Sequence, residues 1–173
     1  SEAGLEGASR FLRKIWNLVD QFITAGPTPK FDRSKLSDGA QAVRRKAHET
    51  LKKADDDFGR RIQFNTVVSG VMELCNEIGK LKVVDDNDRG AIGEAIRIAL
   101  IAISPIAPPI AHSLWSSLGE TEALIDVRWP KVDESALEQT SVKMVVQVNG
   151  KVRGNIEVAA DADKEHILGV AKA

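Results

Sequence analysis

The chain has 173 residues, 43% of them hydrophobic, and a formal net charge of −1. This length fits one medium domain, or a domain with part of another, and supplies enough apolar side chains for a core. A near-neutral charge excludes a uniformly basic nucleic-acid-binding protein, so an anionic partner has to meet a local cationic patch. The single cysteine, Cys75, excludes a disulfide framework and a multi-cysteine zinc site. It falls on an apolar helical stripe, which predicts a buried, inert thiol.

No segment has the pattern of a targeting or membrane-spanning sequence. Residues 1–14 lack the continuous apolar stretch of a secretory signal. The longest apolar stretch, near residues 96–110, is interrupted by Ser104 and by three prolines, and it is too short to span a bilayer. We therefore expect a cytoplasmic protein that has no membrane partner.

Apolar side chains at helical spacing predict a bundle of five helices in the first two-thirds of the chain. The first three stripes are Phe11, Leu12, Ile15, Leu18, Val19 and Phe22; Ala40, Val43, Ala47, Leu51, Ala54 and Phe58; and Val67, Val68, Val71, Met72, Cys75 and Ile78. A fourth helix, over residues 87–103, is apolar on most sides and is predicted to be the most buried. The fifth places Ile110, Leu114 and Trp115 inward.

Capping and helix-breaking residues predict where these helices begin and end. Ser37 or Asp38 can cap the second helix, and Gly59 weakens or ends it. Asn65 is the predicted cap of the third helix. The Pro108-Pro109 pair opens the fifth, because proline is tolerated in a first turn.

The pattern changes after residue 118. Residues 119–141 contain six acids against two bases and no helical stripe, which indicates an acidic connector. Residues 142–173 contain a β-hairpin on Asn149-Gly150 and a short helix beginning near Asp163. Two strands and a short helix cannot bury a core alone. We therefore expect a helical bundle over 1–118, a connector over 119–141 and a truncated α+β piece over 142–173.

Two registers of the hairpin are possible. A two-residue turn pairs Val148 with Lys151. A three-residue loop with Gly150 as a bulge instead pairs Val146 with Val152, and it makes one face uniformly apolar. That apolar face consists of Val142, Met144, Val146, Val152 and Ile156. The three-residue loop is preferred, because a one-residue slip would exchange the two faces.

Catalytic and metal-binding patterns are absent from the sequence. The three histidines, His48, His112 and His166, lack metal-ligand spacing, and no phosphate-binding glycine loop occurs. Asp55, Asp56 and Asp57 are adjacent and point in different directions around a helix, so a solvated acidic face is favoured over a metal site. We therefore expect no catalytic residue, no metal and no cofactor in this chain.

A local cationic surface is the remaining candidate for a binding site. Residues 41–61 hold seven lysines and arginines against four acids. Such a face either is simply solvated, with ion pairs along the helix, or contacts a phosphate backbone. The candidates on and after the second helix are Arg44, Arg45, Lys46, Lys53, Arg60 and Arg61, and the hairpin adds Lys151 and Arg153.

The order of several short motifs resembles the leucyl-tRNA synthetases of bacterial type, a family of class I aminoacyl-tRNA synthetases. The motifs are Gly4-Leu5-Glu6-Gly7, Arg10-Phe11-Leu12 and Trp16; Arg44, Arg45, His48, Thr50 and Lys53; Phe64-Asn65-Thr66 and Met72-Glu73-Leu74 with Asn76; Pro105, Pro108, Leu114 and Trp115; and Trp129-Pro130 followed by residues 145–153. The hairpin after Trp129-Pro130 resembles that of the leucyl enzymes in particular. The helical motifs are less specific, because the valyl- and isoleucyl-tRNA synthetases share them loosely. Pro109 departs from the family, which usually has a histidine there.

The resemblance implies a mainly α fold, namely a helical bundle of the anticodon-binding type followed by the start of a C-terminal domain. It implies a parent enzyme that attaches leucine to tRNA(Leu) with ATP and magnesium. The HIGH and KMSKS motifs that hold the nucleotide are absent from this chain, so the fragment alone is predicted to be inactive. Its implied role is to bind and orient tRNA(Leu) alongside the rest of the parent synthetase, without reading the anticodon.

Two other interpretations stay open at this point. The chain can belong to another class I synthetase, valyl or methionyl. It can also be a helical protein-interaction module whose basic face is merely solvated.

Overall fold

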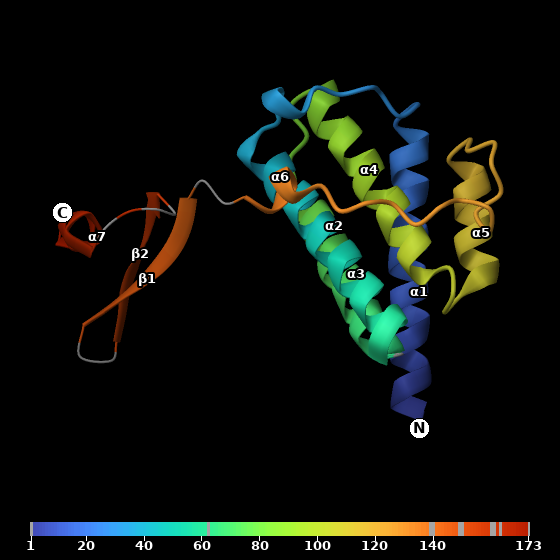
Figure 1. Cartoon of the computed structure of the whole chain (residues 1–173), viewed down its shortest axis with the longest axis horizontal. Coiled ribbons are helices and arrows are strands. Elements are labelled where there is room, and N and C mark those ends of the chain that lie inside the picture. The colour runs from blue at the N-terminus through green and yellow to red at the C-terminus, as the bar shows by residue number, and fades with distance from the viewer. Residues whose placement is uncertain are drawn as a thin grey trace. The chain divides into compact units, whose positions relative to one another are not determined.

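The computed structural model describes residues 2–61, 63–138, 141–148, 151–159, 162 and 164–172. The chain forms two compact units, Ser1–Leu137 and Glu138–Ala173. The first is a bundle of helices and the second holds the hairpin (Figure 1). This is the mainly α fold that the sequence predicts. The predicted boundaries at residues 118 and 141 remain a prediction, and residues 119–137 belong to the same compact unit as the helices.

The connections between the helices of the first unit are short, except those before α2 and before α6. They are α1 (Glu2–Thr24), α2 (Asp38–Asp56), α3 (Phe64–Lys80), α4 (Asp86–Ile103), α5 (Pro108–Ser117) and the short α6 (Glu134–Leu137). A 3-10 turn, Arg33–Lys35, precedes α2, and a π-helical turn, Asp57–Arg61, follows it. Helix α4 packs on α2, α3 and α5. Thirteen of its 18 residues are buried, which confirms that it is the most enclosed helix.

The core consists largely of the predicted stripes. Phe11, Ile15, Val19 and Phe22 of α1 are buried, and so are the five aliphatic residues of the α2 stripe. Met72 was expected inside α3, but it is 40% exposed. Leu74 is fully buried in its place, so the inward face of α3 is rotated from the predicted one.

Side-chain caps set the starts of α2 and α4. Ser37 Oγ accepts a hydrogen bond from the Ala40 N–H, which confirms the predicted cap. The buried Asp88 carboxylate accepts hydrogen bonds from Ser37 N–H and Oγ–H, at 3.0 and 2.8 Å, and so ties α4 to the start of α2. The prediction for Asn65 was wrong, because α3 begins one residue earlier, at Phe64, and has no side-chain cap.

The loop between α1 and α2 lies against the first turns of α4. Arg89 donates hydrogen bonds to the carbonyl oxygens of Phe22, Gly26 and Pro27, and its guanidinium lies 4.4 Å from the centroid of the Phe22 ring. These contacts satisfy carbonyls that the C-terminus of α1 leaves free. Gly26 has φ = 123°, a conformation that favours glycine.

The segment after α5 packs along the bundle. The indole of Trp115 donates a hydrogen bond to the Glu122 carbonyl at 2.9 Å, and Leu124 is buried. The Trp129 and Phe58 rings form a T-shaped pair, with centroids 5.9 Å apart. These contacts position Asp133, which follows directly.

The second unit contains β1 (Ser141–Val148), β2 (Lys151–Ala159) and α7 (Lys164–Lys172), with α7 packed on β2. The preferred register was wrong. Val148 pairs with Lys151, as in the two-residue turn, and Val146 pairs with Gly154. The register shifts between Val146 and Gln147, which leaves Arg153 as the extra residue of a bulge. A bulge next to the turn restores the apolar pairing of Met144 with Ile156 that a regular two-residue hairpin would lose.

Two further sequence predictions can be compared with the described residues. Among them, no helix is long and apolar enough to cross a membrane. Cys75 is 1% exposed, and burial raises the pKa of its thiol to about 11, as expected of an inert cysteine.

Two helical glycines provide a test of this packing. A Cβ at Gly90 would lie 2.5 Å from the Phe31 Cβ, an atom fixed close to the backbone. Gly90→Ala should therefore lower the free energy of unfolding by about 1–3 kcal/mol. A Cβ at Gly79 meets nothing within 4 Å, so Gly79→Ala should be neutral or stabilising by up to about 1 kcal/mol. Urea denaturation measures the free energy of unfolding of both variants. Equal values for the two would contradict the packing of Phe31 against Gly90.

Candidate nucleic-acid interface

Helix α2 carries the cations singled out from the sequence, but the structure separates them by environment. Arg44 is buried, Arg45 and Lys46 are half-buried, and Lys53 is exposed. The side chains of Arg60, Arg61 and Lys151 lie outside the described residues. Arg153, in the second unit, is exposed at the bulge of β2.

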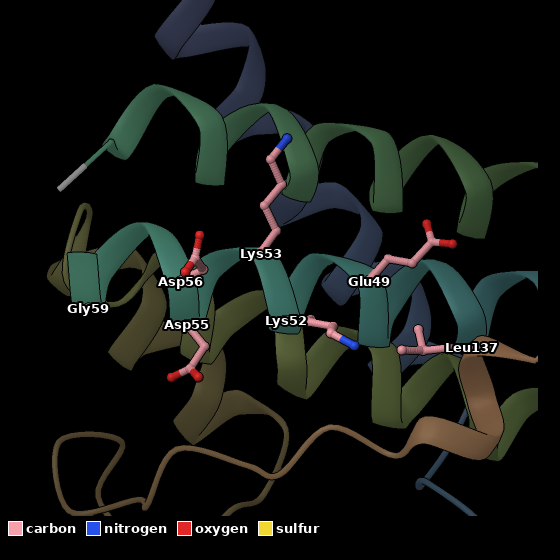
Figure 2. A pocket seen from close by; sticks show the side chains of 7 residues that line it. All are labelled: Glu49, Lys52, Lys53, Asp55, Asp56, Gly59 and Leu137. Atoms are coloured by element: carbon pink, nitrogen blue, oxygen red, sulfur yellow. The ribbon is translucent and has the colours of Figure 1, made fainter. Parts of the chain in front are cut away.

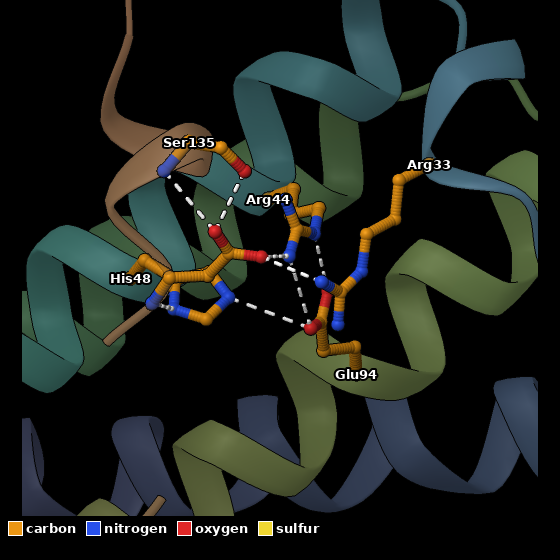
Figure 3. A network of polar contacts seen from close by, with 6 residues as sticks. Arg33, Arg44, His48, Glu94 and Ser135 are labelled. Carbon is orange, nitrogen blue, oxygen red and sulfur yellow. Dashed lines mark hydrogen bonds and ion pairs between the residues drawn. The ribbon is translucent and has the colours of Figure 1, made fainter. Parts of the chain in front are cut away.

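Arg44 lies in a polar network inside the bundle (Figure 3). Its Nε donates to Glu94 Oε2 of α4 at 2.8 Å, and its Nη2 donates to Asp133 Oδ2 at 2.6 Å. Only 5% of the Arg44 side chain is exposed. The guanidinium of Arg44 is therefore occupied by two carboxylates and does not face solvent, and its contact with tRNA stays a prediction.

Asp133 is the centre of this network. Its carboxylate also accepts hydrogen bonds from Arg33 at 2.7 Å and from the N–H and Oγ–H of Ser135, at 3.1 and 2.6 Å. The Ser135 contacts cap the short helix α6. We refer to Arg33, Arg44, His48, Glu94, Asp133 and Ser135 as the Asp133 network. It fastens the segment after α5 to α2 and α4.

His48 completes the network through both ring nitrogens. The backbone N–H of Asp133 donates to His48 Nδ1 at 3.1 Å. Nδ1 is therefore the acceptor, and the proton of the neutral ring sits on Nε2, which lies 3.4 Å from Glu94 Oε1. His48 thus has a structural role here that was not among the sequence-based predictions.

The network keeps its two acids ionised. Hydrogen bonds from Ser135 and Arg44 hold the pKa of Asp133 well below its usual range. Burial alone would raise the pKa of Glu94, but hydrogen bonds from His48 and Arg44 outweigh burial and lower it. A buried guanidinium between two ionised carboxylates is electrostatically satisfied and has no remaining need for an external anion.

The other α2 cations are partly engaged on the surface. Lys46 pairs with Glu73 of α3 at 2.5 Å and lies 3.9 Å from Glu49. A hydrogen bond from Lys46, and then the charge of the more distant Lys53, lower the pKa of Glu73. The Nε of Arg45 is buried and has no hydrogen-bond partner within the described part of the chain. Lys53 is exposed, whereas Arg44, Arg45 and Lys46 are buried or half-buried.

A hollow of about 790 Å³ lies on α2 beside Leu137 (Figure 2). Figure 2 shows Lys52 extending towards Leu137 and Lys53 extending across to α3. Glu49, Asp55 and Asp56 also line the hollow, so it has three carboxylates against two lysines. This balance does not suit a phosphate group. Within the described residues, no cluster of three or more histidine, cysteine, aspartate or glutamate side chains could hold a metal ion.

Comparison with known proteins identifies the class of domain. The model of the family described as the anticodon-binding domain of tRNA ligase matches residues 40–168. The chain therefore belongs to the family of anticodon-binding domains of tRNA ligases.

The relatives narrow this class. The leucine–tRNA ligase of Alcanivorax borkumensis is 47% identical over 99% of this chain and 21% of its own length. The leucine–tRNA ligase of Alkalilimnicola ehrlichii is 48% identical over 95% of this chain and 19% of its own. The chain thus spans about a fifth of the length of these relatives. They confirm the resemblance that the motifs indicated.

A solved structure shares the fold. It is the ternary complex of an Agrobacterium radiobacter K84 LeuRS with tRNA and LeuAMS. The similarity covers 100% of this chain and 23% of that one, with a TM-score of 0.76 and 18% identity. At this identity the comparison supports the fold of the chain and nothing finer.

Removal of Arg44 should test its structural role. Arg44→Ala leaves two carboxylates without their shared cation and should lower the free energy of unfolding by about 3 kcal/mol. Lys53→Ala, on the same helix but exposed, should change it by less than about 0.5 kcal/mol. Chemical denaturation monitored by circular dichroism distinguishes the two. A stable Arg44→Ala variant would mean that the network is dispensable.

The lowered pKa values predict loss of stability in acid. A carboxyl group whose pKa is lower in the folded state contributes stability above its unfolded pKa, about 4, and loses it as pH falls towards the folded pKa. Asp133→Asn removes one such group. The free energy of unfolding should then fall less steeply below pH about 4 than in the parent chain. Asp126→Asn, at an exposed site, is the control, and an unchanged slope for Asp133→Asn would refute the assignment.

Proposed function

We propose that this chain is the tRNA-binding part of a leucine–tRNA ligase, an enzyme that attaches leucine to tRNA(Leu) with ATP and magnesium. The family match over residues 40–168 carries the proposal. The 47–48% identity to leucine–tRNA ligases over nearly the whole chain supports leucine as the amino acid that the enzyme attaches. The role proposed for this segment is to bind and orient the tRNA, and catalysis and ATP binding are assigned to the remainder of the ligase.

The bundle suits a positioning role. The Asp133 network and the Asp88–Ser37 link fix the helices to one another, so cations on their outer faces are held at defined separations. Contacts to phosphates position a nucleic acid without reading its sequence. The proposed partners are therefore tRNA(Leu) and the rest of the ligase, and the cytoplasmic location expected from the sequence is part of the same proposal.

The exposure and ion pairs of the predicted cations rank them as candidate contacts. Arg44 ranks lowest, because it is buried and paired. Lys53 and Arg153 are favoured, because both are exposed. Lys46 must first break its pair with Glu73 to reach a phosphate. Arg45, Arg60, Arg61 and Lys151 are retained from the sequence-based prediction.

Variants of the ligase that contains this chain test the proposal. Lys53→Ala combined with Arg153→Ala should weaken tRNA(Leu) binding and reduce its salt slope by roughly one unit for each true phosphate contact. Leucylation should fall through a higher KM for tRNA. Leucine-dependent pyrophosphate exchange should not change, because that step involves no tRNA contact.

Lys35→Ala is the control, since Lys35 is exposed and lies 3.7 Å from Asp32 in the loop before α2. Loss of pyrophosphate exchange in the double variant would indicate structural damage. Absence of tRNA binding by the unmodified ligase would refute the proposed function.

A further inference from the structure

A groove between α1 and α3 has a chemical character that the sequence motifs did not reveal. It has a volume of about 410 Å³. Its α1 side carries Arg10, Arg13 and Lys14, at i, i+3 and i+4, followed by Asn17 and Gln21. All five side chains are exposed. Residues at these spacings share one face of a helix, so the three cations form a single patch.

Within the part of the chain that the structure describes, the patch has no carboxylate partner, and no acidic side chain lines the groove. Arg13 donates to Ser9 Oγ at 3.2 Å, and Lys14 donates to Asn76 Oδ1. Both acceptors are neutral, so the positive charges are not compensated. Glu6 and Asp20 lie on the same helix, but among the described residues neither forms an ion pair with these cations.

Several other surface cations of the bundle are paired with acids, unlike the cations of this patch. Lys46 pairs with Glu73 and Lys80 pairs with Glu77, so two acids of α3 are engaged by cations outside the groove. Lys52 pairs with Glu134 of α6. An ion-paired cation must give up its carboxylate to bind a new anion, and that carboxylate then repels the anion. The cations of the α1–α3 groove bear no such penalty.

The shape of the groove suits an extended polyanion. Arg10 and Gln21 are eleven residues apart on a helix, which corresponds to about 16 Å. This length exceeds a single phosphate group. A Cβ at Gly79, on the α3 side, would meet nothing within 4 Å, so this wall leaves room for a backbone to approach. The amides of Asn17 and Gln21 can both donate and accept hydrogen bonds, as contacts to ribose hydroxyl groups require.

We propose that the α1–α3 groove binds the phosphodiester backbone of RNA through Arg10, Arg13 and Lys14. This surface is separate from the α2 and hairpin cations, and the inference rests on the proposed function, with tRNA(Leu) as the RNA. The alternative occupant, an acidic segment of the same ligase, is distinguished by the experiments below.

The first experiment compares two triple variants of the chain that each remove three positive charges. Arg10→Gln, Arg13→Gln and Lys14→Gln alter the groove. Lys30→Gln, Lys35→Gln and Lys52→Gln alter exposed sites elsewhere, and two of these form ion pairs. Fluorescence anisotropy with a labelled tRNA(Leu) transcript is measured from low to physiological salt. The groove variant should bind at least tenfold more weakly at low salt, with a salt slope smaller by about two to three units. The control should retain most of the affinity.

The second experiment measures proximity. Cys75 is the single cysteine and is buried, so Asn17→Cys places one reactive thiol in the groove. An iron chelate attached there should cleave the tRNA backbone at a limited set of nucleotides. The same reagent on Lys30→Cys should not cleave at those nucleotides.

Three results would overturn the inference. If the unmodified chain does not bind tRNA, the groove assignment fails, and tRNA binding by the ligase decides the proposed function. If it binds and the groove variant matches the control, only the groove assignment fails. If groove substitutions leave tRNA affinity intact but lower leucylation by the ligase, the groove contacts the protein and not the RNA.

Discussion

The burial of one guanidinium between two carboxylates constrains the whole bundle. Arg44 of α2 can be buried only if Glu94 of α4 and Asp133 are both in place, because an isolated buried charge is strongly destabilising. Glu94 and Asp133 lie 50 and 89 residues beyond it in the chain. A buried ionic group contributes little net stability relative to an apolar replacement. Its effect here is to disfavour every arrangement in which one of the three elements is displaced.

Hydrogen bonds at a second site complement this constraint. Asp88 joins the start of α4 to the cap of α2, and Arg89 satisfies carbonyls after α1. In both places a polar side chain of α4 organises a connection and not the helix itself. The helices supply the apolar core, and the buried charges determine how their ends are joined. Surface cations are consequently presented from a framework with few alternative arrangements.

The helices could be predicted because their signals are local. Each of these signals spans only a few residues. Examples are the helical spacing of Phe11, Ile15 and Val19, the cap at Ser37, and the helix start at Pro108-Pro109. The buried face of α3 was harder to predict from the sequence. Met72 and Leu74 are both apolar, and only tertiary packing decides which one is buried. The hairpin register required a bulge at Arg153, which neither regular register contains.

The site could be predicted less well, because the role of a cation depends on partners distant in sequence. Arg44 and Arg45 are adjacent and chemically identical, yet Arg44 is held by Glu94 and Asp133. The acid-rich composition of residues 119–141 indicated a connector, and it gave no sign that Asp133 pairs with the buried Arg44. A signal was available in part: a histidine and an arginine one turn apart on a helix face suit a shared acidic partner. The sequence did not show which acid that is.

The same reasoning decides where an anion can bind on a nearly neutral protein. Counting cations favours α2, which has the densest basic sequence. However, a lysine such as Lys46 brings its acidic partner with it, so its net field at a phosphate is small. Cations hydrogen-bonded only to neutral groups, such as Arg13 and Lys14, retain their full charge. Because attraction to a polyanion depends on uncompensated charge, a sparser stripe on α1 presents the stronger site. Its strength follows from the absence, among the described residues, of carboxylates paired with these cations and not from the number of the cations.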